Sequence, residues 1–186
     1  MALLQNPPPI LPPTTETVIT YSTPVGEIYI VEQPNLLVSG GTTGLRTWEP
    51  SFLVSEWLLE QDIQGMQVLE LGAGTGLVGI IAAKKGAKIL ATDGSNTVVT
   101  KLKENYKLNN VIAETQVLRW GEQNQSLESK WDLILGADVT YHEEICSSLA
   151  KTYAIGLKQA GLGILAAPVR NEKTLEAFVM ACGMDF

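Results

Sequence analysis

The sequence contains few of the residues that hydrolases and disulfide-bonded proteins depend on. Among its 186 residues are one histidine, His142, and two cysteines, Cys146 and Cys182. A Ser-His-Asp triad is not expected, because the one histidine is not accompanied by a nucleophile elbow. We interpret His142 as a solvent-side residue at a helix start, with a catalytic base as the alternative. Both cysteines lie in apolar, helix-like stretches and are expected in the core, with a disulfide or a catalytic thiol as the alternative.

Long apolar runs and an excess of positive charge are missing as well. No run of about eighteen apolar residues occurs, and the chain does not open with a charged segment followed by an apolar one, so neither membrane spanning nor secretion is supported. With 13 basic and 20 acidic residues the formal net charge is -7. Such a charge disfavours binding to nucleic-acid backbones. We therefore expect a cytoplasmic protein with no membrane, nucleic-acid or metal partner.

What the sequence does contain is a glycine-rich stretch, VLELGAGTGLVG at residues 68–79, between a predicted strand and a predicted helix. Its glycines allow the backbone to turn tightly and to approach a ligand closely. About twenty residues further on, a second apolar strand ends in Asp93, and an acid at this place can hold two ribose hydroxyls. The arrangement is typical of a site for a nucleotide-type cofactor.

Two classes of cofactor fit this stretch. Gly74-x-Gly76-x-x-Gly79 matches the dinucleotide fingerprint. The longer pattern Glu70-x-Gly72-x-Gly74-x-Gly76 places a carboxylate where it would repel a pyrophosphate but attract the amino group of S-adenosylmethionine. We therefore favour S-adenosylmethionine as the cofactor. A chain of 186 residues is also short for a two-domain dehydrogenase. An NAD(P)-dependent oxidoreductase and a catalytically silent binding module remain the alternatives.

Strand and helix patterns alternate along the chain, which predicts an α/β fold with a Rossmann-like, doubly wound parallel sheet. Ligands of such folds bind beyond the carboxyl ends of the strands, where Glu70, Asp93, Trp120 and Asp138 are each expected. The predicted strands are 68–71, 89–92, 115–119, 131–137 and 162–167. Two β-branched and aromatic runs around a turn signal predict an additional N-terminal hairpin, 18–21 with 27–31.

Composition and capping patterns predict the structure of the segments that precede the glycine-rich stretch. Residues 1–16 are predicted to form a Pro-rich flexible arm, with a partner-docking segment as the alternative, and residues 17–186 a single domain. A helix with Thr47 as candidate cap and Pro50 in its first turn follows. Its expected apolar stripe is Leu53, Val54, Trp57 and Leu58. Trp48 lies off this stripe. On spacing alone we favour a packing anchor, with a wall of the ligand site as the alternative.

Three segments, 44–49 (GLRTWE), 68–76 and 133–141 (LILGADVTY), resemble the eukaryotic protein-lysine methyltransferases of the seven-strand class. The similarity extends over roughly residues 15–186, and the first segment is most similar to the elongation factor 2 lysine methyltransferase branch. The resemblance implies S-adenosylmethionine as cofactor, protein-lysine N-methylation as activity, and a protein substrate, with elongation factor 2 as the suggested one.

The resemblance also implies the roles of single residues. The implied cofactor-binding residues are Trp48, Glu70, Gly72, Gly74, Gly76, Asp93, Trp120 and Ala137. The family signature acid-x-x-Tyr falls on Asp138 and Tyr141, which are implied to hold the substrate lysine and to be catalytic. For Trp48 this replaces the packing interpretation by cofactor contact.

Members of the family continue past the last helix into two more strands, whereas this sequence ends at Phe186. We therefore expect a shortened domain without strands six and seven, in which the strand at 162–167 is an open edge. Such a chain is expected to bind S-adenosylmethionine weakly and to transfer methyl groups poorly. The alternative is that the N-terminal hairpin covers this edge.

Overall fold

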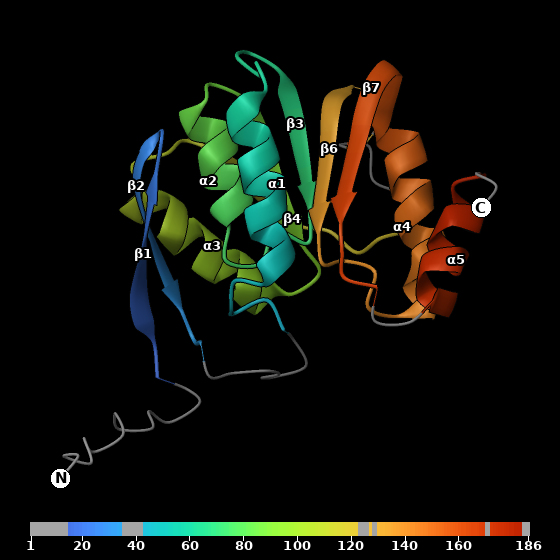
Figure 1. Ribbon diagram of the computed structural model, residues 1–186, viewed down its shortest axis with the longest axis horizontal. Helices are drawn as coiled ribbons and strands as arrows, with labels where there is room; N and C mark the ends of the chain where they lie inside the picture. Colours follow the sequence, from blue (N-terminus) through green and yellow to red (C-terminus); the bar gives the residue numbers. More distant parts are fainter. Residues whose placement is uncertain (1–14, 35–42, 123–126, 128–129, 170–171, 184–186) are drawn as a thin grey trace, which may run out of the picture.

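The computed structural model describes residues 15–34, 43–122, 127, 130–169 and 172–183. Most of the predicted Pro-rich arm lies outside these residues, and the division into an arm and one domain stays a prediction. The described part contains an antiparallel hairpin and a five-stranded parallel sheet with helices on both faces (Figure 1). The predicted doubly wound α/β fold with an N-terminal hairpin is confirmed.

The parallel sheet has the order β5-β4-β3-β6-β7. Its strands are β3 (Gln67–Leu71), β4 (Lys88–Asp93), β5 (Glu114–Val117), β6 (Trp131–Ala137) and β7 (Leu157–Ala166). The chain runs outward from β3 to β5 and then crosses back to β6 on the other side of β3. This reversal creates a crevice at the carboxyl ends of β3 and β6, where ligands of doubly wound sheets bind.

Two strands of the parallel sheet differ from their predicted bounds by more than one residue. β5 ends at Val117, three residues before Trp120, and β7 begins at Leu157 instead of 162. The first residues of β7 are exposed and carry no apolar alternation, and a bulge shifts its register against β6 between Trp131 and Leu133. A strand without a buried face leaves no period-2 signal in the sequence, which is why its start was missed.

Helices cover both faces of the sheet. They are α1 (Glu49–Glu60), α2 (Leu77–Lys84), α3 (Asn96–Leu108), α4 (Glu143–Gly156) and α5 (Glu172–Ala181). α1, α2 and α3 share a hydrophobic cluster with Val68 of β3, whereas Leu149 and Tyr153 of α4 pack with Leu69 on the opposite face. α5 packs on α4, with the rings of Tyr153 and Phe178 6.4 Å apart. The alternation along β3 thus assigns each side chain to one of two cores.

Three local predictions on helices are corrected by the structure. Thr47 does not cap α1: Trp48 occupies that position without a side-chain cap, and the Thr47 hydroxyl bonds instead to the Thr75 hydroxyl at 2.7 Å. Leu53 is 62% exposed, because one residue along a helix turns about 100° away from the buried Val54. Cys182 is exposed in the turn that follows α5, while Cys146 is buried as expected, and both thiols are free.

The hairpin consists of β1 (Thr17–Thr23) and β2 (Gly26–Glu32), and it lies against α3 and α2. Ile28 and Ile30 of β2 are fully buried there. The alternative in which the hairpin covers β7 is therefore wrong.

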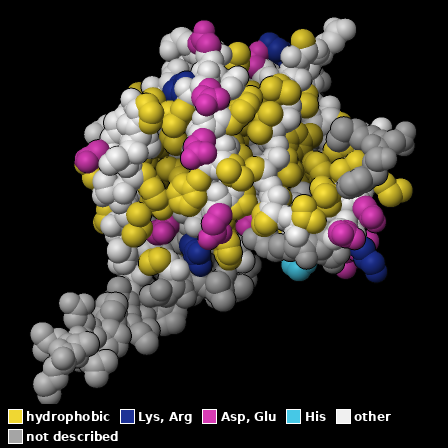
Figure 2. All heavy atoms as spheres, in the orientation of Figure 1, with side chains coloured by type: hydrophobic (Ala, Val, Ile, Leu, Met, Phe, Trp, Pro, Cys, Tyr) yellow, Lys and Arg dark blue, Asp and Glu magenta, His cyan; other side chains and the backbone are white. Residues whose placement is uncertain are grey.

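Among the described residues β7 pairs with β6 alone, and its Leu162 is 50% exposed. Hydrophobic side chains also gather on the face that carries α1 (Figure 2).

Candidate active site

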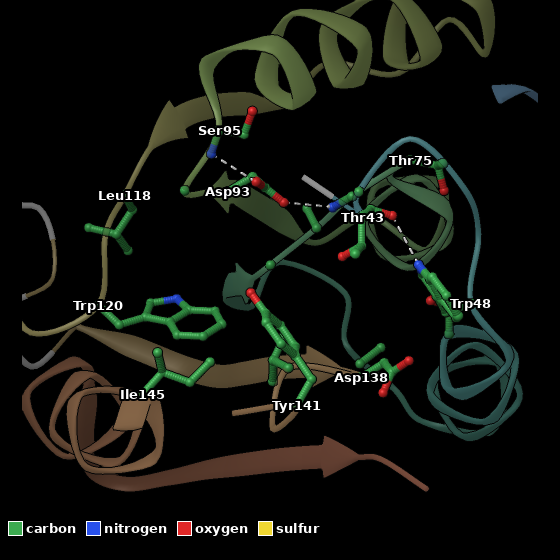
Figure 3. A pocket seen from close by; sticks show the side chains of 18 of the residues that line it. Thr43, Trp48, Thr75, Asp93, Ser95, Leu118, Trp120, Asp138, Tyr141 and Ile145 are labelled. Atoms are coloured by element: carbon green, nitrogen blue, oxygen red, sulfur yellow. Dashed lines mark hydrogen bonds between the residues drawn. The ribbon is translucent and has the colours of Figure 1, made fainter. Parts of the chain in front are cut away.

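A cavity of about 700 Å³ opens at the carboxyl ends of β3, β4 and β6 (Figure 3). Most of the residues implied by the resemblance line it together. These are Trp48, Gly72, Gly74, Asp93, Trp120, Ala137, Asp138 and Tyr141. Glu70 and Gly76 are not among the lining residues. Segments far apart in the sequence thus converge on one cavity large enough for a small-molecule ligand.

The glycine loop between β3 and α2 forms the floor of the cavity. Gly72, Gly74 and Gly76 have φ values of 69°, 54° and 91°, which side chains rarely adopt. A Cβ atom on Gly72 would lie 2.5 Å from Cγ1 of Val139, and one on Gly74 would lie 3.4 Å from the carbonyl oxygen of Gly44. Gly76 is the N-cap of α2 and packs against Leu102, so its lack of a side chain serves the fold.

Asp93 joins the glycine loop to the start of α3. Its Oδ2 accepts a hydrogen bond from the Gly74 N–H at 3.3 Å, and its Oδ1 accepts one from the Ser95 N–H at 3.0 Å. Burial raises the pKa of Asp93, while these backbone N–H groups oppose the shift. The carboxyl group is held from two sides and lines the cavity, as a group that binds ribose hydroxyls must.

The Glu70 side chain points away from the cavity, toward the face of the sheet that packs on α2 and α3. It shares a face with Val68, is 3% exposed, and meets the Tyr106 hydroxyl above Gly79, where a Cβ atom would lie 2.5 Å from Glu70 Oε2. Burial, and then the charge of Asp93, raise the pKa of Glu70 to about 8. Direct contact of Glu70 with a ligand in the cavity is not supported. Gly79 is required by this packing, so the match to the dinucleotide fingerprint needs no pyrophosphate.

Asp138 and Tyr141 follow β6. Asp138 has a φ of 58°, an uncommon value for a residue with a side chain, and its N–H bonds to the carbonyl oxygen of Ala166 at 2.8 Å. Tyr141 is 51% exposed, and partial burial followed by the charges of Asp93 and Asp138 raises its pKa. Figure 3 shows its ring extending into the cavity between Trp120 and Asp138. Both side chains are accessible from solvent and from the cavity.

Two tryptophans stand on opposite sides of the cavity (Figure 3). Nε1 of Trp48 donates a hydrogen bond to the Thr43 carbonyl oxygen at 3.0 Å, and the guanidinium carbon of Arg46 lies 4.9 Å from its ring centroid. Trp120 packs over Gly72. Its Nε1 is buried without a hydrogen-bond partner among the described residues. A buried donor of this kind in a cavity wall is suited to an acceptor atom of a ligand.

A family model described as "Lysine methyltransferase" matches residues 36–181. The chain belongs to this family. Protein-lysine N-methyltransferase EFM3 of Saccharomyces cerevisiae is 35% identical over 84% of the chain and 53% of its own length. Protein N-lysine methyltransferase METTL21A of Mus musculus is 34% identical, over 68% of this chain and 61% of its own length. EEF1A lysine methyltransferase 3 of Mus musculus is 32% identical, over 72% of this chain and 59% of its own length. The chain spans about half the length of the EFM3 proteins it matches.

Solved structures show the same fold. The Thermus thermophilus 16S rRNA N2 G1207 methyltransferase RsmC, in complex with AdoMet and guanosine, has a TM-score of 0.71 at 20% identity, covering 95% of this chain and 48% of its own. A methyltransferase from Pyrococcus furiosus has a TM-score of 0.59 at 23% identity, covering 70% of this chain and 69% of its own. The fold is that of S-adenosylmethionine-dependent methyltransferases. Family and fold together indicate S-adenosylmethionine as the cofactor.

The cavity fits this cofactor in three respects. The glycine loop leaves room for close approach, Asp93 presents carboxylate oxygens suited to ribose hydroxyls, and Trp120 presents a buried N–H without a partner. In the described part of the chain, no group of three or more His, Cys, Asp or Glu side chains could hold a metal ion. No described helix is long and apolar enough to span a membrane.

Sequence reasoning missed several residues that line the cavity. Among the missed lining residues are Arg46, Ser95, Leu118, Val139 and Ile145. Each is a neighbour of a predicted residue, placed one to four positions away in a turn or at a helix start. A rule that extends each strand-end motif into the next helical turn would have found Ser95, Val139 and Ile145. It would not have found Arg46 and Leu118, which precede the predicted tryptophans. His142 is exposed at the N-cap of α4, as interpreted, and also lines the rim of the cavity.

Proposed function

We propose that this protein is an S-adenosylmethionine-dependent protein-lysine N-methyltransferase that acts on a translation elongation factor in the cytoplasm. The observation that carries the proposal is that Asp138 and Tyr141 share one cavity with the glycine loop and Asp93. The elongation factor is supported by the name of one relative, EEF1A lysine methyltransferase 3, at 32% identity. Elongation factor 2 in particular rests on the resemblance of segment 44–49.

The substrate amine must be neutral before it can react. A lysine in water has a pKa of about 10.4 and is protonated at neutral pH. S-adenosylmethionine, when bound, supplies the methyl group on a positively charged sulfonium, and a nearby positive charge lowers the pKa of the amine. Tyr141 is half exposed, so a lysine from a protein surface reaches it from solvent. The lysine proton is then lost to water at the open mouth of the cavity.

Asp138 and Tyr141 act on the neutral amine. The carboxylate of Asp138 and the hydroxyl of Tyr141 accept its remaining N–H groups and orient its lone pair toward the floor of the cavity. Such alignment supplies much of the rate enhancement in a displacement between two bound groups. The conformation of Asp138 is held by the backbone bond to Ala166 of β7, so β7 supports the substrate side of the site.

The remaining residues of the cavity are assigned to the cofactor. Asp93 accepts the ribose hydroxyls, Gly72 and Gly74 let the backbone approach the ligand, and Trp120 donates its free N–H. Trp48, directly before α1, and Ala137, the last residue of β6, form walls of the cavity. Glu70 and Gly76 contribute through the packing of the loop on α2 and α3 and do not contact the ligand.

The proposal is tested with the purified chain in two steps. Calorimetric titration with S-adenosylhomocysteine should show binding, whereas NADH should not bind; preference for NADH would refute a methyltransferase. Transfer of labelled methyl groups is then measured on elongation factor 2 and on elongation factor 1A. Cofactor binding without transfer to either protein would leave a binding module as the function.

A further inference from the structure

Asn105 of α3 is 1% exposed and lies outside the cavity, yet its side chain bonds to two separate parts of the molecule. Its Oδ1 accepts the Val31 N–H of β2 at 2.9 Å. Its Nδ2 donates to the carbonyl oxygens of Val31 at 3.2 Å and of Thr75 in the glycine loop at 2.9 Å. Both amide protons and one oxygen lone pair are used, so the side chain joins the hairpin to the loop.

Thr75 is held from its other side as well. It stands between Gly74 and Gly76, and its hydroxyl bonds to the Thr47 hydroxyl at 2.7 Å in a buried place. The Thr47 N–H in turn donates to Oε2 of Glu32 at the end of β2, at 2.7 Å. These contacts form a closed ring that runs from the hairpin through residues 47 and 75 to Asn105 and back. The ring includes Thr75, which is flanked on both sides by glycines with positive φ.

We infer that Asn105 is a positioning residue that keeps the glycine loop in its cofactor-binding conformation and ties this conformation to the hairpin. The inference rests on the proposed binding of S-adenosylmethionine at this loop. A segment with three glycines has large conformational freedom when it is not held. Without the Asn105 amide, the Thr75 carbonyl would be buried without this donor, and ligand binding would have to order the loop. The loss would therefore appear in cofactor affinity.

Asn109, one helical turn later, offers a matched control. Its Oδ1 accepts the Tyr29 N–H at 2.8 Å, and its Nδ2 donates to the Tyr29 carbonyl oxygen at 2.6 Å. It anchors the same hairpin to the same helix with the same type of side chain, and its remaining bond goes to the carbonyl oxygen of Asn105, within α3. A comparison of the two asparagines separates the contact with the loop from the docking of the hairpin.

The experiment compares wild type, Asn105→Ala and Asn109→Ala by calorimetry with S-adenosylhomocysteine, by thermal unfolding, and by hydrogen exchange of residues 68–79 without ligand. Both variants should unfold at a lower temperature. Asn105→Ala should weaken binding roughly tenfold, as expected for one lost hydrogen bond to a buried carbonyl, and Asn109→Ala by less than about twofold. Exchange in the loop should be faster in Asn105→Ala only.

Asn105→Asp serves as a second variant if the alanine chain does not fold. It keeps the side-chain volume and the acceptor for Val31 but replaces the donor to Thr75 by an acceptor, so it should also weaken binding. Wild-type affinity in either Asn105 variant, or an equal loss in Asn109→Ala, would overturn the inference. Absence of binding to the wild-type chain would refute the proposed function instead.

Discussion

Replacement of Glu70 by glutamine should remove a pH dependence of stability that burial imposes on this protein. The carboxyl is 3% exposed, and its pKa rises from an ordinary value of 4.5 to about 8. Below pH 4.5 the folded and unfolded chains both carry the proton. Between 4.5 and about 8 the unfolded chain releases it while the folded chain retains it. The stability present at low pH is therefore lost progressively as the pH rises through this window.

The separation of the two pKa values sets the magnitude. At 1.36 kcal/mol for each pH unit, the loss at pH 8 and above amounts to as much as roughly 5 kcal/mol. Glutamine is neutral at every pH, and its amide can meet the same neighbours, the Gly79 backbone and the Tyr106 hydroxyl. Glu70→Gln should therefore be close to wild type in stability at pH 5 and clearly more stable at pH 8 to 9.

Urea unfolding followed by circular dichroism at intervals from pH 5 to pH 9 measures this difference. Because groups that do not interact with Glu70 titrate equally in both proteins, the difference between the two free energies reports Glu70 together with the charges coupled to it. Glu56→Gln, at an exposed position of α1, is the matched control and should show no such trend. A stability difference between Glu70→Gln and wild type that stays constant over this range would refute the buried, protonated carboxyl.

Two further predictions address the cavity. Asp93→Ala should weaken S-adenosylhomocysteine binding by ~1–3 kcal/mol in calorimetry, the range for unpaired polar partners; unchanged affinity would rule out a ribose contact. Asp138→Ala and Tyr141→Phe should lower methyl transfer far more than cofactor affinity, and an equal loss of both would reassign them to the cofactor.

Features encoded by local patterns were predictable from the sequence. The hairpin, the five parallel strands and the acids at strand ends follow from alternation and from runs of apolar residues, and the topology of parallel sheets then brings Asp93 and Asp138 to one edge. The tryptophans of the cavity were assigned through resemblance, because spacing alone favoured packing for Trp48. A side chain at a helix start can face either way, and the choice depends on partners distant in sequence.

Features that depend on such distant partners were not predictable. Thr47 matches a helix cap by residue type, but a hydroxyl 28 residues away in the glycine loop binds it instead. The direction of the Glu70 side chain is a different case. Glu70 is two residues after Val68 on the same strand, so its side chain was already expected on the face of the sheet that α1, α2 and α3 cover. The motif was interpreted as a ligand contact although alternation along the strand indicated burial. Strand parity should therefore be applied before a strand-end carboxylate is assigned to a ligand.

The third glycine of the dinucleotide-like pattern leads to the last prediction. Gly79 lies inside α2, where alanine would ordinarily favour the helix by about 1 kcal/mol. A Cβ atom there would, however, overlap the Tyr106 hydroxyl and Oε2 of Glu70, both fully buried. Overpacking of this kind costs about 1–3 kcal/mol, so Gly79→Ala should be destabilising on balance.

Tyr106→Phe removes the atom that meets the new methyl group and should recover part of the stability lost in Gly79→Ala. A double-mutant cycle of the two changes, measured by urea unfolding, should therefore give a coupling energy above about 0.5 kcal/mol. If Gly79 instead served a pyrophosphate, its substitution would weaken NADH binding and would not couple to Tyr106. Additive effects of the two substitutions would show that packing against α3 is not what requires a glycine at this position.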